Sequence, residues 1–374
     1  MRNAIHAVVM RGGARTGVFL RADVLPAEPA GRDALLLRLI DSPNLYGLLG
    51  DAPDGGAPAA VSVALVSPSL RADCDVSCYF GRVNMRSRRI DYSGYCTDLA
   101  AAVGHYAVAE GLFPPVEDSG TVRVWQENRR ERLLVHLPKA GEAPAWAGRD
   151  GSTGGPRDGR GIDIDFLGRD PAAPCLSSEQ SAELLILADG TRLRVSLVIS
   201  GNPTVFVRAD DLGLTATEQP NQFPVAILEL LEEIRCAACV RMGLADSPQA
   251  AHRQHPDTPE VAMVGPPRGM QDGRGEFHPA TAMDVCARIV TNGRPHHGFS
   301  TAGAVALAIA ARVPGTVVSE AARPGTRPLT LGHAGGLMAV DAEVRLQEAV
   351  WVADRARITS TASRLAVSTI PVID

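Results

Sequence analysis

Two stretches of small apolar residues, one in each half of the chain, dominate its hydrophobic pattern. They run from Leu99 to Ala109 and from Thr301 to Ala311, and neither has a polar face. Alanine favours the helix, and a helix that is apolar all round is a buried one. We therefore expect two central helices, at residues 96–111 and 300–312.

The residues that lead into these two helices are also alike. Gly94-Tyr95-Cys96-Thr97 opens the first and Gly298-Phe299-Ser300-Thr301 opens the second, so glycine, aromatic, small polar residue and threonine match in turn. The match predicts two similar halves, residues 1–190 and 191–374, each built around its own helix. The final strands of the chain could return to the first half.

Most other segments alternate apolar and polar residues with a period of two, as strands do. Val122–Gln126 and Arg132–Leu137 are examples, and Asp189-Gly190 between two such segments is a hairpin signal. Residues 224–244 form a further long helical pattern. Many antiparallel strands with one dominant buried helix per half predict an α+β fold, in which two mostly antiparallel sheets are each wrapped on a helix.

Length and composition narrow the class of protein. A chain of 374 residues, with 45% hydrophobic and 21% charged residues, is long enough for two domains. The net charge of −5 argues against a nucleic-acid-binding surface. No segment has the roughly 20 consecutive apolar residues that span a membrane. Because the N-terminus does not resemble a signal peptide and seven cysteines are an odd number, we expect a cytoplasmic protein with reduced thiols.

The cysteine pattern does not predict a metal site. Cys236 and Cys239 form a CxxC, but they lie in an expected helix and no second pair has zinc spacing, so core packing is favoured over metal or redox chemistry. Nearly all basic residues are arginine, and Lys139 is the only lysine in the chain. This limits the choice of a catalytic base.

Residues 12–17, Gly-Gly-Ala-Arg-Thr-Gly, connect the first two expected strands. Glycines let backbone N–H groups approach a ligand, and Arg11 or Arg15 could bind a carboxylate through two hydrogen bonds. An ordinary β-hairpin with solvated arginines explains the segment equally well. The spacing matches neither of the common phosphate-binding loops, GxxxxGK[ST] and GxGxxG.

Cys96 lies at the expected N-terminus of the first helix. Unpaired N–H groups and the positive end of the helix dipole favour an anion there, and therefore a thiolate. Cys96 is a candidate acid/base group, although a small buried cysteine would also fit this position. Asp98 in the same turn is either a second proton-transfer group or a carboxylate that complements the helix dipole.

Several motifs, in order along nearly the whole chain, resemble those of one family. They are Met10-Arg11-Gly12-Gly13, Gly17-Val18-Phe19, Ser42-Pro43, Val66-Ser67-Pro68-Ser69, Cys96 at a helix start, Gly201-Asn202-Pro203-Thr204-Val205-Phe206-Val207, Ile234-Arg235 with Arg241-Met242-Gly243, and Pro314-Gly315-Thr316-Val317-Val318. Together they resemble the PrpF-type family, which includes 2-methylaconitate cis-trans isomerase, 3-methylitaconate delta-isomerase and 4-oxalomesaconate tautomerase. The resemblance implies the diaminopimelate-epimerase-like fold, with two pseudo-symmetric halves and an active site in the cleft between them.

Members of this family shift a proton across an allylic system in unsaturated di- or tricarboxylates and need neither metal nor cofactor. The resemblance implies Cys96 as the acid/base, because it matches the family's cysteine. Its partner is Asp98 or His296, which matches a histidine that the family often carries before the second helix, although a lone loop histidine is more often structural. Backbone and side-chain groups of both halves are the expected substrate-binding set: Gly12, Gly13, Arg15, Thr16, Ser62, Tyr95, Thr97, Gly201, Asn202, Ser300 and Thr301.

The chain departs from the family pattern at the expected site. The family's Gly-Gly-Thr-Ser-Lys-Gly loop stands here as Gly12-Gly13-Ala14-Arg15-Thr16-Gly17, and its Asn-Cys-Gly-Asn segment stands as Tyr95-Cys96-Thr97-Asp98. Ser62 takes the place of a lysine that is a proposed catalytic base in the family, and Lys139 is too distant along the chain to replace it. Tyr95 would narrow the pocket or stack on an unsaturated substrate. We therefore expect an altered site.

These observations predict a cofactor-independent isomerase or tautomerase acting on a small molecule, an unsaturated carboxylate or a related enolisable compound. Two alternatives stay open. One is a cyclase or other enzyme of a specialised biosynthetic pathway on the same scaffold, and the other is a non-catalytic ligand-binding or accessory protein. The sequence predicts no nucleic-acid or membrane partner, and a homodimer is left open.

Overall fold

The computed structural model describes residues 4–13, 15–42, 60–85, 87–92, 97–114, 120–138, 161–167, 173–325 and 327–371. The chain forms two compact units. Unit 1 holds the described residues up to 138, residues 161–164 and those from Ser360 onward, and unit 2 holds those from Asp165 to Thr359. Residues 165–167 and 173–190, which the sequence pattern assigned to the first half, belong to unit 2.

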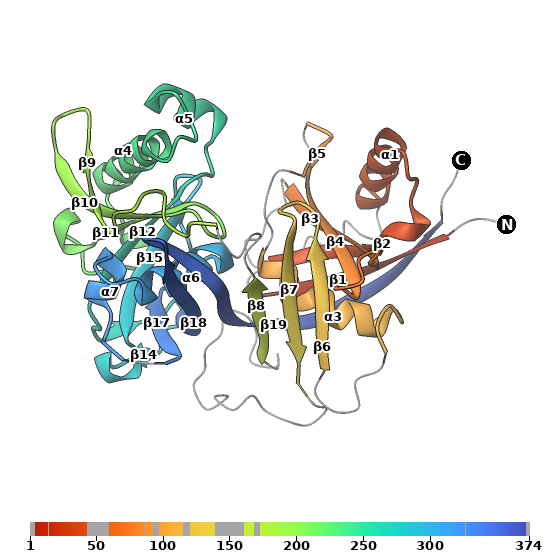
Figure 1. Cartoon of the computed structure of the whole chain (residues 1–374). Coiled ribbons are helices and arrows are strands. Elements are labelled where there is room, and N and C mark those ends of the chain that lie inside the picture. Colours follow the sequence, from red (N-terminus) through yellow and green to blue (C-terminus); the bar gives the residue numbers. More distant parts are fainter. Residues whose placement is uncertain are drawn as a thin grey trace. The chain divides into compact units, whose positions relative to one another are not determined.

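Unit 1 consists of strands around the helix α3 (Figure 1). The strands are β1 (Ala4–Gly12), β2 (Arg15–Arg21), β3 (Ala60–Pro68), β4 (Val76–Asn84), β5 (Arg89–Asp91), β6 (Gly120–Gln126), β7 (Glu131–Leu137), the first part of β8 (Gly161–Leu167) and the last part of β19 (Val350–Pro371). The helices are η1 (Ala22–Val24), α1 (Pro29–Ile40), η2 (Thr97–Leu99) and α3 (Ala100–Ala109). Strand β1 pairs antiparallel with β2 and β19, whereas the pairs β2–β3 and β4–β6 are parallel.

Small side chains let the strands approach α3 closely. The helix packs against β1, β3, β6 and β7, and Ala100–Ala102 have no exposed surface. A Cβ atom at Gly104 would lie only 2.7 Å from Cγ1 of Val135 on β7. The expected first helix is thus present as η2 followed by α3, and its alanines and glycine set the distance between helix and sheet.

Unit 2 repeats this arrangement with a second set of elements. Its strands are β9 (Glu183–Ile186), β10 (Arg192–Val198), β11 (Thr204–Arg208), β12 (Glu260–Gly265), β13 (Met270–Gln271), β14 (Phe277–His278), β15 (Val285–Thr291), β16 (Arg294–Pro295), β17 (Leu329–His333), β18 (Gly336–Gln347) and the first part of β19. Its helices are η3 (Asp210–Leu212), η4 (Pro220–Gln222), α4 (Val225–Arg241), α5 (Pro248–Gln254), η5 (Ala280–Ala282), α6 (Thr301–Arg312) and α7 (Val317–Ala321). Pairs β11–β12 and β15–β17 are parallel. The antiparallel pairs are β9–β10, β10–β11, β12–β15, β13–β14, β15–β16, β17–β18 and β18–β19.

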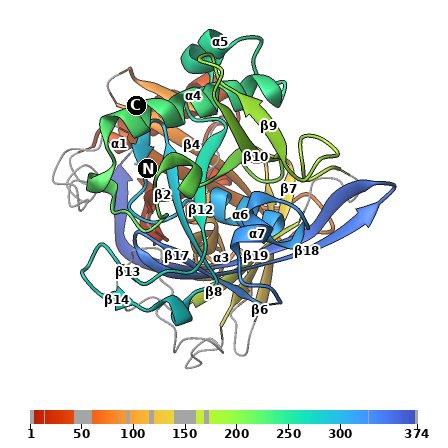
Figure 2. The same ribbon diagram turned by 90° about the vertical axis from the view of Figure 1, so that its left-hand side faces the viewer.

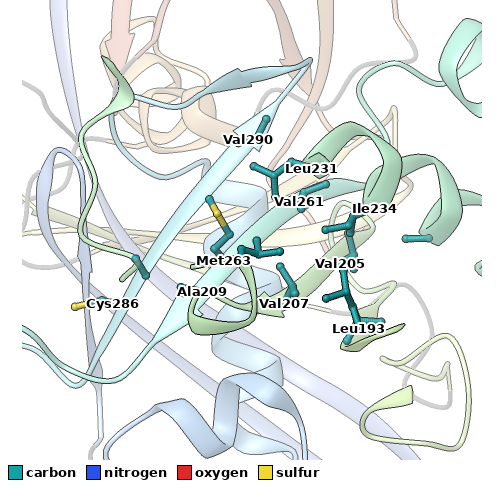
Figure 3. Packing of buried hydrophobic residues seen from close by; sticks show 14 of the residues in the cluster. Leu193, Val205, Val207, Ala209, Leu231, Ile234, Val261, Met263, Cys286 and Val290 are labelled. Carbon is teal, nitrogen blue, oxygen red and sulfur yellow. The ribbon is translucent and has the colours of Figure 1, made fainter. Parts of the chain in front are cut away.

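The sheet of unit 2 has a helix on each face. Leu231 and Ile234 of α4 pack beside Val205 and Val261 in one hydrophobic cluster (Figure 3). On β15, Val290 belongs to this cluster, whereas its neighbour Ile289 meets α6 at Gly303. Successive side chains of a strand point to opposite faces, so α4 and α6 cover different sides. Helix α7 lies beside α6, as Figure 2 shows.

Several expectations from the sequence are confirmed. The Asp189-Gly190 segment joins β9 and β10 as an antiparallel hairpin, with Gly190 at a φ of +88°. The second central helix is α6, and residues 225–241 form the long helix α4. Among the described residues, no helix combines the length and the apolar character needed to cross a membrane.

Candidate functional site

In unit 1, the turn between β1 and β2 packs directly against the start of the first central helix. A Cβ atom at Gly12 would lie 2.5 Å from the backbone oxygen of Asp98 and 2.8 Å from Cα of Leu99. A Cβ atom at Gly17 would lie 2.6 Å from Cδ1 of Leu99. Gly13 has a φ of +53° and donates its N–H to the carbonyl of Thr361 at 2.9 Å. These glycines are therefore required by close approach and by the turn.

The strand register decides which loop side chains face the helix. Gly12 faces η2, at the start of the first central helix, and pairs with Arg15 across the β1–β2 ladder, so Arg15 lies on the same face. Ser62 pairs with Gly17 in the parallel β2–β3 ladder and also lies on this face. Thr16 pairs with Arg11. Because strand residues alternate between faces, both side chains of this second pair project from the opposite side. The fold thus brings together Gly12, Arg15 and Ser62, but not Thr16.

An ion pair connects this face of the loop to the helix. The Nε of Arg15 donates to Oδ2 of Asp98 at 3.0 Å. The Asp98 side chain is only 11% exposed and that of Arg15 is 43% exposed. Thr97 beside it is buried. The carboxylate is therefore held inside the helix start, while solvent still reaches the guanidinium.

Cys96 and Tyr95 lie outside the described residues, so their roles stay predictions. The six cysteines that the structure describes are all buried. Burial raises the pKa of five of these thiols, to about 11 in Cys175 and Cys236 and by a smaller shift in Cys74, Cys239 and Cys286. A raised pKa keeps a thiol protonated and unreactive. Within the described part of the chain, no better thiolate candidate than Cys96 emerges.

In unit 2, the start of α6 is capped by Ser300. Its Oγ accepts the N–H of Gly303 at 3.0 Å and donates to Oε2 of Glu260 at 2.9 Å. Thr291 donates to the other oxygen of the same carboxylate at 3.1 Å. Glu260 is 4% exposed. The Ser300 hydroxyl is therefore used by the helix cap and by Glu260, and a ligand would have to displace one of these contacts.

The other expected residues of unit 2 surround the same helix start. Gly201 has a φ of +75°, and a Cβ atom there would lie 3.3 Å from Cγ1 of Val305 on α6. The carbonyl of Asn202 accepts a hydrogen bond from Thr204 at 2.9 Å. Thr301 is buried. The turn that precedes β11 and the first turns of α6 are thus in contact.

Two histidines flank Gly298, just before α6. Nδ1 of the half-buried His296 accepts the Gly298 N–H at 3.1 Å. His333, at the end of β17, is fully buried, and its Nδ1 accepts the Gly335 N–H at 3.1 Å. Burial, with the nearby charge of Arg288, lowers the pKa of His333 to about 3. Its ring is therefore neutral with the proton on Nε2, which has no hydrogen-bond partner among the described residues.

One group of side chains on α4 and α5 has the spacing of metal ligands. The ligand atoms of Glu232, Cys236 and His252 all lie within 4.8 Å of one another, and no other such group is found among the described residues. However, Arg235 donates to both carboxylate oxygens of Glu232 at 2.7 Å, and its Nη2 lies 3.2 Å from Sγ of Cys236. A metal ion would have to bind beside this guanidinium. We interpret the group as a hydrogen-bonded ion pair, in agreement with the packing role expected for Cys236.

Glu260 and His333 are the features that sequence reasoning missed. Glu260 opens an otherwise apolar strand, and an acidic residue at the edge of a buried strand is a usable signal for a polar contact. His333 had no comparable signal, because its burial depends on the packing of β17 against residues distant in the sequence.

The fold defines the class of protein. The fold is that of the diaminopimelate-epimerase-like proteins, as the resemblance implied. A crystal structure of methylitaconate-delta-isomerase has a TM-score of 0.79 and 26% identity, covering 99% of this chain and 95% of that one. A hydroxyproline epimerase from Agrobacterium vitis has a TM-score of 0.54 and 15% identity, covering 100% of this chain and 95% of that one, and shows the shared fold alone.

The family follows from the sequence comparisons. The model described as PrpF protein matches residues 2–372, and the chain belongs to this family. A protein of Shewanella oneidensis named 2-methyl-aconitate isomerase is 33% identical over 96% of this chain and 94% of its own length. A protein of Eubacterium barkeri named 3-methylitaconate isomerase is 29% identical over 90% of each chain. The protein is an isomerase of the PrpF family.

Proposed function

We propose that the protein is a cofactor-independent isomerase or tautomerase that moves a proton within an unsaturated carboxylate, with a site that differs from the family pattern. The contact between the β1–β2 turn and the start of the first central helix supports this proposal most. It gathers Gly12, Arg15 and Ser62 on the face of the strands that meets the helix start, where Asp98 follows Cys96 by two residues. Relatives named for methylaconitate and methylitaconate carry out chemistry of this type.

The reaction requires a base and donors for the charge that develops. A base removes the proton from the carbon next to the double bond, and the electron pair moves through the double bond toward the carboxylate as a dienolate. Hydrogen-bond donors stabilise the oxygen atoms that receive the charge. The proton then returns at the other end of the allylic system, so that no atoms are gained or lost. The base needs a pKa near neutral to serve in both steps.

The residues of this chain fit these tasks unequally. Ser62 cannot act as the base, because a hydroxyl does not ionise near neutral pH. We assign the base to Cys96, which can also return the same proton at the other end of the allylic system. His296, whose Nδ1 accepts the Gly298 N–H, stays a second candidate for the returning proton. The backbone N–H of Thr97, at the start of the first central helix, is a proposed donor to the carboxylate. Asp98 is the alternative proton carrier.

Proton exchange in D2O tests the proposal directly. The purified protein is incubated with 2-methylaconitate, 3-methylitaconate or 4-oxalomesaconate, and also with unsaturated monocarboxylates, and deuterium uptake is followed by NMR. The wild type should introduce deuterium at an allylic carbon, and Cys96→Ser should lower the rate by about 100-fold or more. Cys74→Ser, a buried cysteine of the same unit, serves as the matched control. Unchanged exchange in Cys96→Ser would disprove the role of Cys96, and no exchange with any compound would disprove the isomerase itself.

A further inference from the structure

We propose that the ion pair between Arg15 and Asp98 selects substrates by charge, so that the site favours an unsaturated monocarboxylate over di- and tricarboxylates. In this proposal Asp98 is a positioning residue that holds Arg15 and balances its charge, and it does not transfer a proton. The inference rests on the proposed function, because it assigns the substrate class of the same site.

The geometry identifies Arg15 as the cation of this face of the loop. Arg15 shares the helix side of the β1–β2 ladder with Gly12, whereas Arg11 lies on the other side. Its Nε is bound to Oδ2 of Asp98 at 3.0 Å. An Arg–carboxylate contact of this length is a charge-assisted hydrogen bond, stronger than a neutral one. The two side chains together therefore contribute no net positive charge for a bound anion.

The close fit of the turn keeps this balance in place. The backbone oxygen of Asp98 lies only 2.5 Å from the position of a Cβ atom at Gly12, so the helix start and the turn are packed in direct contact. The Asp98 carboxylate is also largely buried, and removal of Arg15 would take a cation away from a carboxylate that is poorly solvated. A substrate carboxylate can approach the exposed part of Arg15, but each further carboxylate on the substrate would meet the negative charge of Asp98 without a second cation from the loop.

Saturated carboxylates test the charge preference without requiring catalysis. Butyrate, glutarate and tricarballylate carry one, two and three carboxylates, and none can be isomerised. Their dissociation constants are measured by calorimetry for the wild type, Asp98→Asn, Arg15→Ser, Arg15→Lys and the double variant Arg15→Ser/Asp98→Asn. Circular dichroism and thermal unfolding of each variant establish that it is folded. Failure of the isomerase assay leaves this experiment unaffected, so the two proposals can fail separately.

The expected result is a change in the relative affinities for the three ligands and not a uniform loss of affinity. Asp98→Asn keeps the shape of the side chain and frees the charge of Arg15, so affinity should rise by about tenfold for each carboxylate added to the ligand, as one unit charge about 8 Å away produces at an effective dielectric constant of about 30. Arg15→Ser should change the selectivity by a similar factor in the opposite direction. Arg15→Lys keeps the charge and should keep the wild-type selectivity.

The double variant completes the charge balance. It removes one positive and one negative charge, so its relative affinities for the three ligands should lie within about threefold of those of the wild type. Equal selectivity in the wild type and Asp98→Asn would overturn the proposal. A wild type that binds tricarballylate more tightly than butyrate, or a folded wild type and Asp98→Asn that bind none of the three ligands, would overturn it as well.

Discussion

Acid should destabilise unit 2 through one histidine. His333 is fully buried, and burial lowers its pKa from 6.5 to about 3, with a further contribution from the positive charge of Arg288. Above pH 6.5 the ring is neutral in the folded and in the unfolded chain, so the contribution of His333 to stability is fully present. Below pH 6.5 the unfolded chain binds a proton that the folded chain does not. Stability then falls by about 1.4 kcal/mol per pH unit until about pH 3, which amounts to about 2 kcal/mol between pH 7.5 and pH 5.

His333→Asn isolates this effect from that of the other titrating groups. The asparagine oxygen can accept the Gly335 N–H in place of Nδ1, but the side chain does not titrate. Urea unfolding of both proteins between pH 7.5 and pH 5 gives the free energy of unfolding at each pH. The advantage of the wild type over His333→Asn should shrink by about 2 kcal/mol over this range. A constant difference between the two, or an NMR titration of His333 with a midpoint between pH 5 and pH 7, would refute the reasoning.

Two substitutions test the packing and the cap at the helix starts. Gly12→Ala places a Cβ atom 2.5 Å from the backbone oxygen of Asp98 and should lower the free energy of unfolding by about 1–3 kcal/mol. The control is Gly31→Ala, inside helix α1, which should have no destabilising effect. Chemical denaturation measures the free energy of unfolding of both variants. Ser300→Ala removes the N-cap of α6 and a hydrogen-bond donor to Glu260, and should lower the free energy of unfolding by about 2 kcal/mol in the same assay. The control Ser300→Thr keeps the hydroxyl and should retain most of the stability. Equal stability of Ser300→Ala and the wild type would mean that the cap contributes nothing.

The sequence predicts those parts of the fold that depend on local pattern. The two alanine-rich helices and the Asp189-Gly190 hairpin follow from periodicity and turn chemistry, and the structure has all three. The domain boundary depends on long-range pairing instead. Residues 173–186 belong to unit 2 because Pro174 bridges Val352, Leu176 bridges Val198 and β9 pairs with β10. The end of β19 belongs to unit 1 because it pairs with β1. The composition of neither segment indicates to which unit it belongs.

In the candidate site, too, local motifs predict some features, whereas other contacts depend on long-range pairing. Glycines 12, 13 and 201 were identified from their motifs, and each has a close contact or a positive φ in the structure. The partners of the polar side chains could not be identified in this way. Arg15 was expected as a ligand clamp and Asp98 as either a proton carrier or a partner of the helix dipole, but their contact joins residues that are 83 positions apart. Pairings of this kind depend on strand register, which a single sequence specifies only weakly.

Both central helices begin beside a buried carboxylate of the protein itself. Asp98 of η2, just before α3, is bound by Arg15, and Glu260 at the start of α6 is bound by the hydroxyls of Ser300 and Thr291. The positive end of a helix attracts anions, and a carboxylate of the protein at that position takes up part of this attraction. An incoming substrate anion therefore gains less at either helix than it would at an uncompensated N-terminus. The electrostatics of each unit, considered by itself, argue in the same direction, toward a substrate with fewer carboxylates.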